Sequence, residues 1–191
     1  MKFISVNTLK TLLYPKDLCY DGTQLSSHWI YRTFDLAGDA LVAFQGKAQV
    51  TTDHMVDLED VKNNAPIYSP RMLHFVGEWF REGLDIAILY QNLLVRNAYE
   101  ILLQKSLVGL SRKGNDLFFQ NRKLSVSIAT CSAVSLLIHL GINIRTDGTP
   151  VPTAGLNELE ISPMEFADEL LERFSQDFEG WRRARAKVQP R

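Results

Sequence analysis

Apolar residues recur every three or four positions in the middle of the chain, which is the spacing of one buried face of a helix. The longest such stretch predicts a helix over residues 84–105. A second helix is expected just before it, because Ser69 can cap a helix and Pro70 is tolerated in the first turn. Gly83 would end that second helix. The apolar positions that support it are Met72, Val76, Trp79 and Phe80.

A third helix is predicted near the end of the chain. Ser162 and Glu165 are spaced as a capping box, and Pro163 stands in the first turn, where its missing N–H costs no hydrogen bond. The apolar periodicity supports a helix that ends near Phe178. The basic segment 182–191 is expected to be frayed.

Alternating apolar and polar residues predict β-strands in the rest of the chain. The expected strands cover residues 3–7, 41–44 resuming at 48–50 after Gly46, 116–119, 123–130 and 135–145. Turns are expected at 20–24 and 120–122 and a loop at 146–160, from their turn-forming residues. The predicted fold class is therefore α+β, with antiparallel strand pairs and the three helices on one face. No linker-like segment interrupts the chain, which favours one domain over residues 1–191.

Composition narrows the class of protein without naming a function. The 191 residues are 46% hydrophobic, and 21 Lys and Arg against 22 Asp and Glu give a net charge of −1. That balance argues against a nucleic-acid partner, and the lack of an apolar run of about 18 residues argues against a membrane span. Cys19 and Cys131 are too few for a disulfide framework, and the first residues lack a signal-peptide pattern, so we expect a cytoplasmic protein. The sequence leaves a homodimer open.

The residues with the most chemical character lie on one predicted strand. Alternation puts small and cationic side chains on one face, namely Lys123, Ser125, Ser127 and Ala129. It puts apolar side chains on the face expected to pack against helices, namely Leu124, Val126 and Ile128. Pairing with the next strand would add His139 and Asn143 to the Lys123 face. A floor of small side chains beside a cation, an imidazole and an amide suits a small anionic ligand; the alternative is a solvent-exposed sheet surface.

Three short motifs in this region resemble the catalytic core of the biotin protein ligases and lipoate ligases. They are Gly114-Asn115-Asp116-Leu117, Asn121-Arg122-Lys123-Leu124 and Leu140-Gly141-Ile142-Asn143-Ile144, in that family's order and at similar spacing. The resemblance implies a biotin/lipoate-ligase-like, class II synthetase-like α+β fold with a mixed, largely antiparallel sheet flanked by helices. It also implies that Lys123 is the catalytic lysine, which contacts the substrate carboxylate and the acyl-adenylate phosphate. Asn115 would lie near the nucleotide, and ATP with Mg²⁺ would be the co-substrate.

Two further resemblances extend beyond this core. Arg122-Lys123 and His139-Leu140-Gly141-Ile142-Asn143-Ile144 resemble elements of the lipoyl (octanoyl) transferases, and segment 38–44 is a weaker echo of the same proteins. Over its whole length the chain is similar to an uncharacterised family, Domain of Unknown Function family 366. The segments that carry this similarity are 20–25, 54–61, 123–130 and 148–156. The similarity to this family implies no particular activity.

Two differences from the ligases and transferases keep several functions open. The phosphate-binding loop of the biotin ligases, rich in glycine and arginine, has no counterpart in this sequence. The transferases use a cysteine nucleophile where this chain has Thr153, and a thioester route needs a thiolate. The sequence is therefore compatible with an ATP-dependent enzyme that activates a small carboxylic acid, with a non-catalytic ligand-binding or regulatory module, and with an acyl transferase that lacks a cysteine nucleophile.

Other candidate residues lie outside the predicted strands. Asp39, in a Gly-Asp turn, would bring a carboxylate to the rim of the ligand pocket. His54 and Asp57 are candidate metal ligands, since imidazole and carboxylate groups suit Zn²⁺ or Mg²⁺; the alternative is an exposed acidic turn. His74, within the helix predicted after Pro70, is expected to be a packing histidine.

Overall fold

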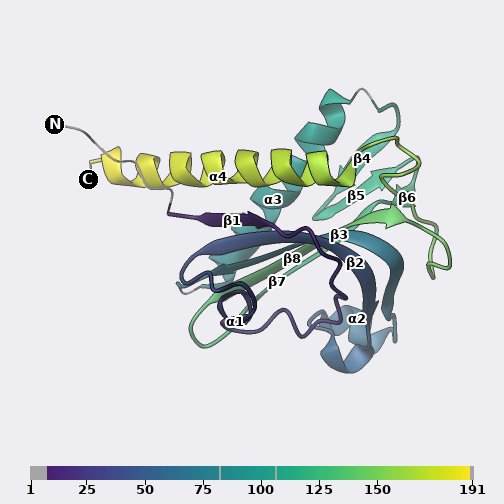
Figure 1. Cartoon of the computed structure of the whole chain (residues 1–191), viewed down its shortest axis with the longest axis horizontal. Coiled ribbons are helices and arrows are strands. Elements are labelled where there is room, and N and C mark those ends of the chain that lie inside the picture. Colours follow the sequence, from purple (N-terminus) through teal and green to yellow (C-terminus); the bar gives the residue numbers. More distant parts are fainter. Residues whose placement is uncertain (1–7, 82, 106, 190–191) are drawn as a thin grey trace.

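The computed structural model describes residues 8–81, 83–105 and 107–189, which form two β-sheets and the helices around them (Figure 1). The elements, in chain order, are β1 (Lys10–Leu13), α1 (Trp29–Phe34), β2 (Ala40–Val50), the 3-10 helix η1 (Thr52–His54), α2 (Leu58–Lys62), β3 (Ile67–Trp79), α3 (Leu84–Gln104), β4 (Leu110–Lys113), β5 (Asp116–Phe119), β6 (Arg122–Lys123), β7 (Ser125–Cys131), β8 (Leu136–Arg145) and α4 (Pro163–Lys187). The large sheet has the strand order β1-β2-β3-β8-β7 and the small sheet β4-β5-β6. β1 pairs parallel with β2, and the other strand pairs are antiparallel. The predicted α+β class with a mixed, largely antiparallel sheet is confirmed.

Helices α3 and α4 cover one face of the large sheet and lie above it in Figure 1. The core between them is apolar and fully buried, with Phe75, Leu140 and Ile142 of the sheet packed in one cluster with Leu94 of α3 and Phe174 of α4. Burying one such side chain stabilises the fold by about 1.5–3 kcal/mol. This layer therefore fixes the helices to the sheet.

The C-terminal helix begins as predicted and ends later than predicted. The Ser162 hydroxyl accepts a hydrogen bond from the N–H of Glu165 at 3.4 Å, with a proline in the first turn. The helix does not end near Phe178 but continues to Lys187, so the prediction of a frayed segment from residue 182 is wrong for most of that segment. Two interactions hold the extra turns: Trp181 packs edge-on against Tyr90 of α3, and the basic residues of the last turn complement the helix dipole.

The opposite face of the large sheet carries α1 and α2, which lie below it in Figure 1. Ile30 of α1 packs with Val42 and Phe44 of β2 and Val76 of β3 in a second apolar cluster. β2 and β3 are thus buried on both faces at this end of the sheet. Towards their other end, near α2, the same face of the sheet holds the cavity described below.

β3 occupies the segment where the sequence predicts a helix after Ser69, so that prediction is wrong. Leu73 and Phe75 point into the helix-covered core, while Met72, His74 and Val76 lie on the other face and are also buried. A strand buried on both faces is apolar at nearly every position, and its pattern cannot be told from a helix by periodicity. Pro70 is tolerated because it lies at the shift in register between Ala48↔Ser69 and Gly46↔Met72.

The side chains of β7 face the opposite way from the prediction. Ser125, Ser127 and Ala129 stand opposite Ile142, Leu140 and Ile138 of β8, on the helix-covered side. Val126 and Ile128 stand opposite Gly141 and His139 and line the cavity. The alternation shifts at Leu124, which lies between β6 and β7 and is buried in the same core as the β8 residues. Lys123 therefore shares the cavity with the apolar residues of β7 rather than with Ser125.

The remaining predictions fall into three groups. The helix over 84–105 and the strands over 116–119 and 135–145 are confirmed within one residue at each end. The elements β1, α1, α2 and β4, each of four to six residues, were not predicted from the sequence. The strand expected over residues 3–7 lies outside the described residues. In the described part of the chain, no helix has the length and apolar character that crossing a bilayer requires.

Candidate functional site

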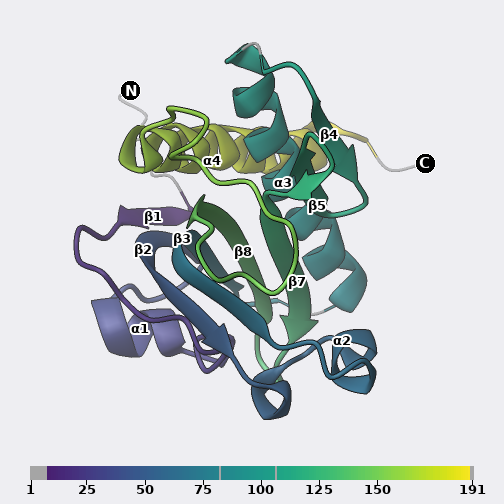
Figure 2. The same ribbon diagram turned by 90° about the vertical axis from the view of Figure 1, so that its right-hand side faces the viewer.

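A cavity of about 590 Å³ lies on the face of the large sheet opposite α3 and α4. Figure 2 shows the surrounding segments, with α2 at one end of the sheet and the connection from β8 to α4 beside β7 and β8. The sheet supplies the apolar side chains of Val50, Ile67, Met72, Val126 and Ile128, and the aromatic side chains of the cavity are those of Tyr20 and Tyr68. The polar side chains include His54, Asp57, Asp60, Asp116, Lys123, Ser127, His139, Asn143 and Thr153. This volume and this mixture are typical of a small-molecule site.

Lys123 is held in the cavity wall by its main chain. Its N–H donates to the carbonyl of Pro152 and its carbonyl accepts from the N–H of Ala154, both at 3.0 Å. The Asn143 side-chain amide also donates to the Lys123 carbonyl, at 3.2 Å. The ammonium lies 3.0 Å from the Asp116 carboxylate, and the Lys123 side chain keeps 33% of its surface exposed. The structure therefore presents a fixed, accessible cation at this cavity.

Three aspartates line the cavity together with this cation, and each has different surroundings. Asp116 pairs with Lys123. Asp57 caps α2, its carboxylate accepting from the N–H groups of Glu59 and Asp60. Partial burial raises the pKa of Asp60 above its usual value, Asp57 and Asp116 raise it further, and Lys123 acts in the opposite direction. Asp60 thus takes up a proton more readily than an unperturbed aspartate does.

A buried imidazole pair lies at the other end of the sheet face that lines the cavity. Nδ1 of His74 is 3.1 Å from Nε2 of His139, and Nε2 of His74 is 3.2 Å from the Gly46 carbonyl oxygen. The Tyr20 ring stacks on His139 at 3.7 Å between centroids. Burial lowers the pKa of His74 to about 4, and burial together with His74 lowers the pKa of His139. Both imidazoles are therefore neutral near pH 7.

The two predicted ligand-binding serines, Ser125 and Ser127, and the predicted Asn115 hold the small sheet against the large one. The Ser125 hydroxyl is fully buried and accepts from the N–H of Leu117 at 2.9 Å, so its predicted place on the ligand-facing floor is wrong. Ser127 borders the cavity, but its hydroxyl donates to the Asn115 carbonyl and accepts from the Gln91 amide. These hydroxyls join β5 and the loop before it to β7 and α3, and that is a structural role.

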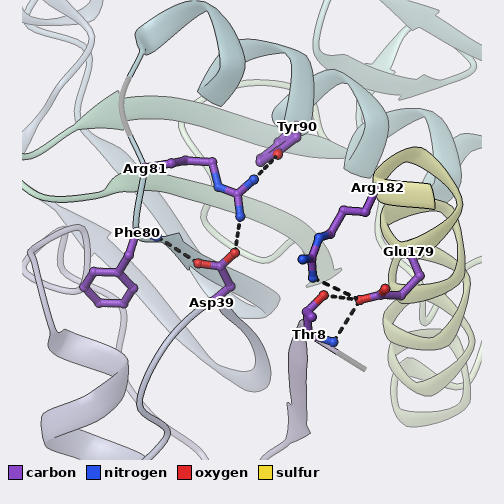
Figure 3. A network of polar contacts seen from close by, with 7 residues as sticks. All are labelled: Thr8, Asp39, Phe80, Arg81, Tyr90, Glu179 and Arg182. Atoms are coloured by element: carbon purple, nitrogen blue, oxygen red, sulfur yellow. Dashed lines mark hydrogen bonds and ion pairs between the residues drawn. The ribbon is translucent and has the colours of Figure 1, made fainter. Parts of the chain in front are cut away.

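Asp39 lies far along the sheet from the cavity, in the network of Figure 3. Its carboxylate pairs with Arg81 and accepts from the N–H of Phe80 at 2.9 Å, and Arg81 donates to the Tyr90 hydroxyl at 3.1 Å. The residue after it, Ala40, pairs with Glu78 at the end of β3 away from the cavity. The expectation that Asp39 reaches the pocket rim is therefore wrong.

Thr153 does lie in the cavity wall, next to Lys123 in a parallel bridge. Its hydroxyl is 2.8 Å from the hydroxyl of Thr149, which is also bonded to the carbonyls of Thr146 and Val151. These contacts tie the loop after β8 into a compact turn over the cavity. Among the described hydrogen bonds of this hydroxyl there is no imidazole or carboxylate that could act as a base.

His54 and Asp57 both border the cavity, but each has a local structural partner. His54 Nδ1 is 3.2 Å from the Asp21 carbonyl, and Asp57 is the cap of α2. Across the residues with described positions, no group of three His, Cys, Asp or Glu side chains converges to hold a metal ion.

Sequence reasoning missed several residues of this site. Tyr20 and Tyr68 line the cavity, and neither belongs to a sequence pattern that predicts a ligand site. His74 was assigned to a helix, and its contact with His139 depends on the register between β3 and β8. Asp116 stood within the ligase-like motif, and its charge, seven residues before Lys123, was the one available signal.

Comparison with known proteins identifies the family of this chain. The family described as Domain of unknown function (DUF366) matches residues 9–189. The chain belongs to the DUF366 family. An uncharacterised protein from Methanocaldococcus jannaschii is 38% identical over 163 residues, which cover 81% of this chain and 73% of that protein. A protein of unknown function from Pyrococcus horikoshi is 37% identical with a TM-score of 0.92, covering 96% of this chain and 99% of that one.

More distant structures share the fold of this DUF366 protein. A putative lipoate protein ligase from T. acidophilum is 18% identical with a TM-score of 0.59, covering 89% of this chain and 85% of that one. A mutant biotin protein ligase from Aquifex aeolicus in complex with biotin is 16% identical with a TM-score of 0.58, covering 89% of this chain and 70% of that one. The predicted biotin/lipoate-ligase-like fold is thus confirmed, and at these identities the likeness concerns the fold alone.

Proposed function

We propose that this DUF366 protein binds a small carboxylic acid in the cavity and that the Lys123 ammonium receives the carboxylate. The observation that carries the proposal is the position of Lys123, a partly exposed cation whose main chain is hydrogen-bonded on both sides in the wall of a cavity of about 590 Å³. Two fold relatives support the ligand class, since one was solved with biotin and another with lipoic acid, which are both carboxylic acids.

The ion pair with Asp116 leaves room for a ligand. An ammonium has three N–H donors, and Asp116 occupies one of them at 3.0 Å. The other donors are available to a ligand carboxylate, while Asp116 limits the directions in which the long side chain can point. A cation oriented in advance loses less conformational entropy when the ligand binds.

The rest of the cavity suits the apolar body of such an acid. Val126, Ile128 and Met72 offer hydrocarbon surface beside Lys123. Burial of ligand hydrocarbon there contributes about 25 cal/mol per Å² of apolar surface removed from water. Lys123 is the one lysine among the described cavity residues, which also include no arginine, so the cavity suits an acid with one carboxylate and a hydrocarbon body.

Activation of the acid with ATP does not form part of the proposal. A relative of the same fold was solved with ATP, but the DUF366 chain lacks the arginine- and glycine-rich phosphate loop. The cavity residues that the structure describes include three aspartates, one lysine and no arginine. Triphosphate would be repelled by those carboxylates, and they do not converge as a Mg²⁺ site within the described residues. These residues do not fit Mg²⁺-ATP, so the structure favours a binding module over a ligase.

Acyl transfer has less support than binding. Thr153 stands where the transferases carry cysteine, and its hydroxyl is bonded to Thr149 rather than to a base. A threonine hydroxyl needs an adjacent base to become a nucleophile.

The proposal is tested by isothermal titration calorimetry of octanoate, lipoate and biotin against wild type, Lys123→Ala and the control Lys113→Ala. Lys113 is an exposed lysine on β4 that stacks on Phe118. Lys123→Ala should weaken binding of the acids by about 2–4 kcal/mol, the loss typical of removing one partner of a desolvated charge pair. Lys113→Ala should bind like wild type. Equal affinities of wild type and Lys123→Ala would refute the proposal.

Two further measurements separate the other candidate functions. Octylamine should bind more weakly than octanoate; the reverse order would mean that the aspartates, not Lys123, select the ligand. Pyrophosphate exchange with ATP and each acid should be absent. Exchange that depends on Lys123 would instead identify an adenylating enzyme.

A further inference from the structure

Gly46, His74 and His139 form a directed chain of hydrogen bonds beside the cavity. The Gly46 carbonyl can only accept, so Nε2 of His74 must carry a proton. His74 is neutral, because burial lowers its pKa to about 4, and its Nδ1 is therefore an acceptor. Nε2 of His139, 3.1 Å away, must then be the donor. The neutral His139 ring is left with a lone pair on Nδ1.

The unprotonated Nδ1 of His139 has access to the cavity. His139 is 3% exposed and belongs to the cavity lining. The one described hydrogen bond of the His139 ring is made by Nε2, and Nδ1 is not among the described side-chain atoms that are both fully buried and unpaired, so Nδ1 keeps some accessible surface. The Tyr20 ring covers one face of the imidazole at an interplanar angle of 11°, which leaves the edge of the ring for a ligand.

The ring orientation depends on Gly141, two residues along β8. A Cβ at Gly141 would lie 3.1 Å from Cε1 of His139 and 2.8 Å from Cε of Met72. The missing side chain therefore makes room for the imidazole between β3 and β7. Tyr20, His74 and Gly141 together hold His139 in one orientation and one tautomer.

We infer that His139 Nδ1 is a second recognition point and that the ligand carries a neutral N–H or O–H donor at the end opposite its carboxylate. This inference rests on the proposed function for the position of the carboxylate at Lys123. A ligand without such a donor would cover Nδ1 and leave a buried acceptor unpaired, which carries a free-energy cost.

The two recognition points are separated by a length that a small acid can span. His139 and Asn143 are four residues apart on the same face of β8, which places their Cα atoms about 13 Å apart. Asn143 donates to the Lys123 carbonyl, so Lys123 lies at the Asn143 end of this span. Both side chains reach into the cavity, and the ligand bridges the remaining distance. The substrate class is therefore a medium-length carboxylic acid with a neutral donor at its far end.

The test compares ω-hydroxy fatty acids of graded chain length with their unsubstituted parents by calorimetry. At the best chain length, wild type should prefer the hydroxy acid by about three- to tenfold, the range of one net hydrogen bond. His139→Phe keeps an aromatic ring against Tyr20 and should abolish the preference. His139→Gln, whose amide can donate to His74 and accept from the ligand, should restore part of it. Tyr20→Phe is the matched control and should keep the preference.

A second measurement does not depend on the stability of the variants. Long-range ¹H–¹⁵N NMR of the wild-type protein should show His139 protonated at Nε2, with its Nδ1 resonance shifting when the hydroxy acid is added. A His139 protonated at Nδ1 would overturn the inference.

The binding outcomes separate this inference from the proposed function. If both acid series bind equally and depend on Lys123, the proposed function stands and the inference is wrong. If neither series binds, the proposed function fails and the inference fails with it. If Tyr20→Phe alone removes the preference, the phenol hydroxyl is the recognition group and the assignment to His139 is overturned.

Discussion

The ammonium of Lys123 lies 3.0 Å from the carboxylate of Asp116, and the two residues come from neighbouring strands of the small sheet. The next residue, Leu124, bonds to both sheets, because its N–H donates to the carbonyl of Leu117 in β5 and its carbonyl accepts from the N–H of Asn143 in β8. The ion pair therefore marks the junction between the two sheets. The position of the proposed ligand-binding cation depends on how the small sheet packs against the large one.

We expect Asp116→Asn to strengthen the binding of small carboxylic acids about fivefold. Asparagine keeps an oxygen that can orient the Lys123 ammonium, but it removes a negative charge that would repel the ligand carboxylate. The charge effect is worth about 1 kcal/mol for a partly exposed pair, and the gain should appear in calorimetric titration with octanoate. Weaker binding by this variant would show that the charge of Asp116, and not only its oxygen, is needed to hold Lys123.

Acidification should destabilise the protein through the buried His74. Its pKa is about 4 in the folded state and 6.5 when unperturbed. Between these values the unfolded chain binds more protons than the folded one, so the stabilisation present above pH 6.5 is lost as the pH falls towards 4. The loss for this group is about 3 kcal/mol. Urea denaturation at a series of pH values would measure it, and His74→Gln should reduce the slope in this window while the contribution of His139, whose pKa is also lowered, remains.

Two glycine substitutions should change stability in opposite directions. A Cβ at Gly46 would lie 1.8 Å from the Leu18 carbonyl oxygen, which is backbone, so we expect Gly46→Ala to lower the free energy of unfolding by more than about 3 kcal/mol. Gly180 lies within α4 with nothing near an added Cβ, and Gly180→Ala should raise stability by about 0.5–1 kcal/mol. Thermal denaturation measures both, and similar shifts of the same sign would contradict this account.

We expect Asp39→Asn to lower stability and leave ligand affinity unchanged. Asp39 pairs with Arg81 in a partly buried position, and Asn loses the charge while it can still accept from the N–H of Phe80. Breaking a fully buried pair costs about 3–5 kcal/mol, and solvent exposure reduces the cost at this site to about 1–2 kcal/mol. A change in affinity for octanoate would show that Asp39 takes part in ligand binding, as the sequence predicted.

The sequence predicted the fold through the elements that are long and one-sided. α3 has a continuous apolar stripe, and the start of α4 has a cap whose hydrogen bond is present in the structure. β3 was misassigned because Leu73 and Phe75 are buried on one face and Met72 and His74 on the other, which removes the alternation that identifies a strand. The pairing of β3 with β2 on one edge and with β8 on the other depends on the tertiary structure, so the local sequence could not predict it.

The candidate site was predictable only where local motifs carried it. Lys123, His139, Asn143 and Thr153 came from motifs, and the structure brings them to one cavity. Ser125 was misplaced because a single residue, Leu124, shifts the alternation where the chain passes from β6 to β7. Tyr20 and Asp60 reach the cavity from segments distant in sequence, and no local pattern encodes that approach.

The strand order of the large sheet has a consequence for synthesis on the ribosome. β2 and β3 form a hairpin early, but the other edge of β3 is covered only by β8, which follows α3 and the whole small sheet in the sequence. Until β8 has emerged, the nascent chain exposes a long apolar strand edge of the kind that pairs with other chains. Closure of the sheet by β8 is therefore expected to be the late step of folding, and the interval before it is when the chain is most open to aggregation and to chaperone binding.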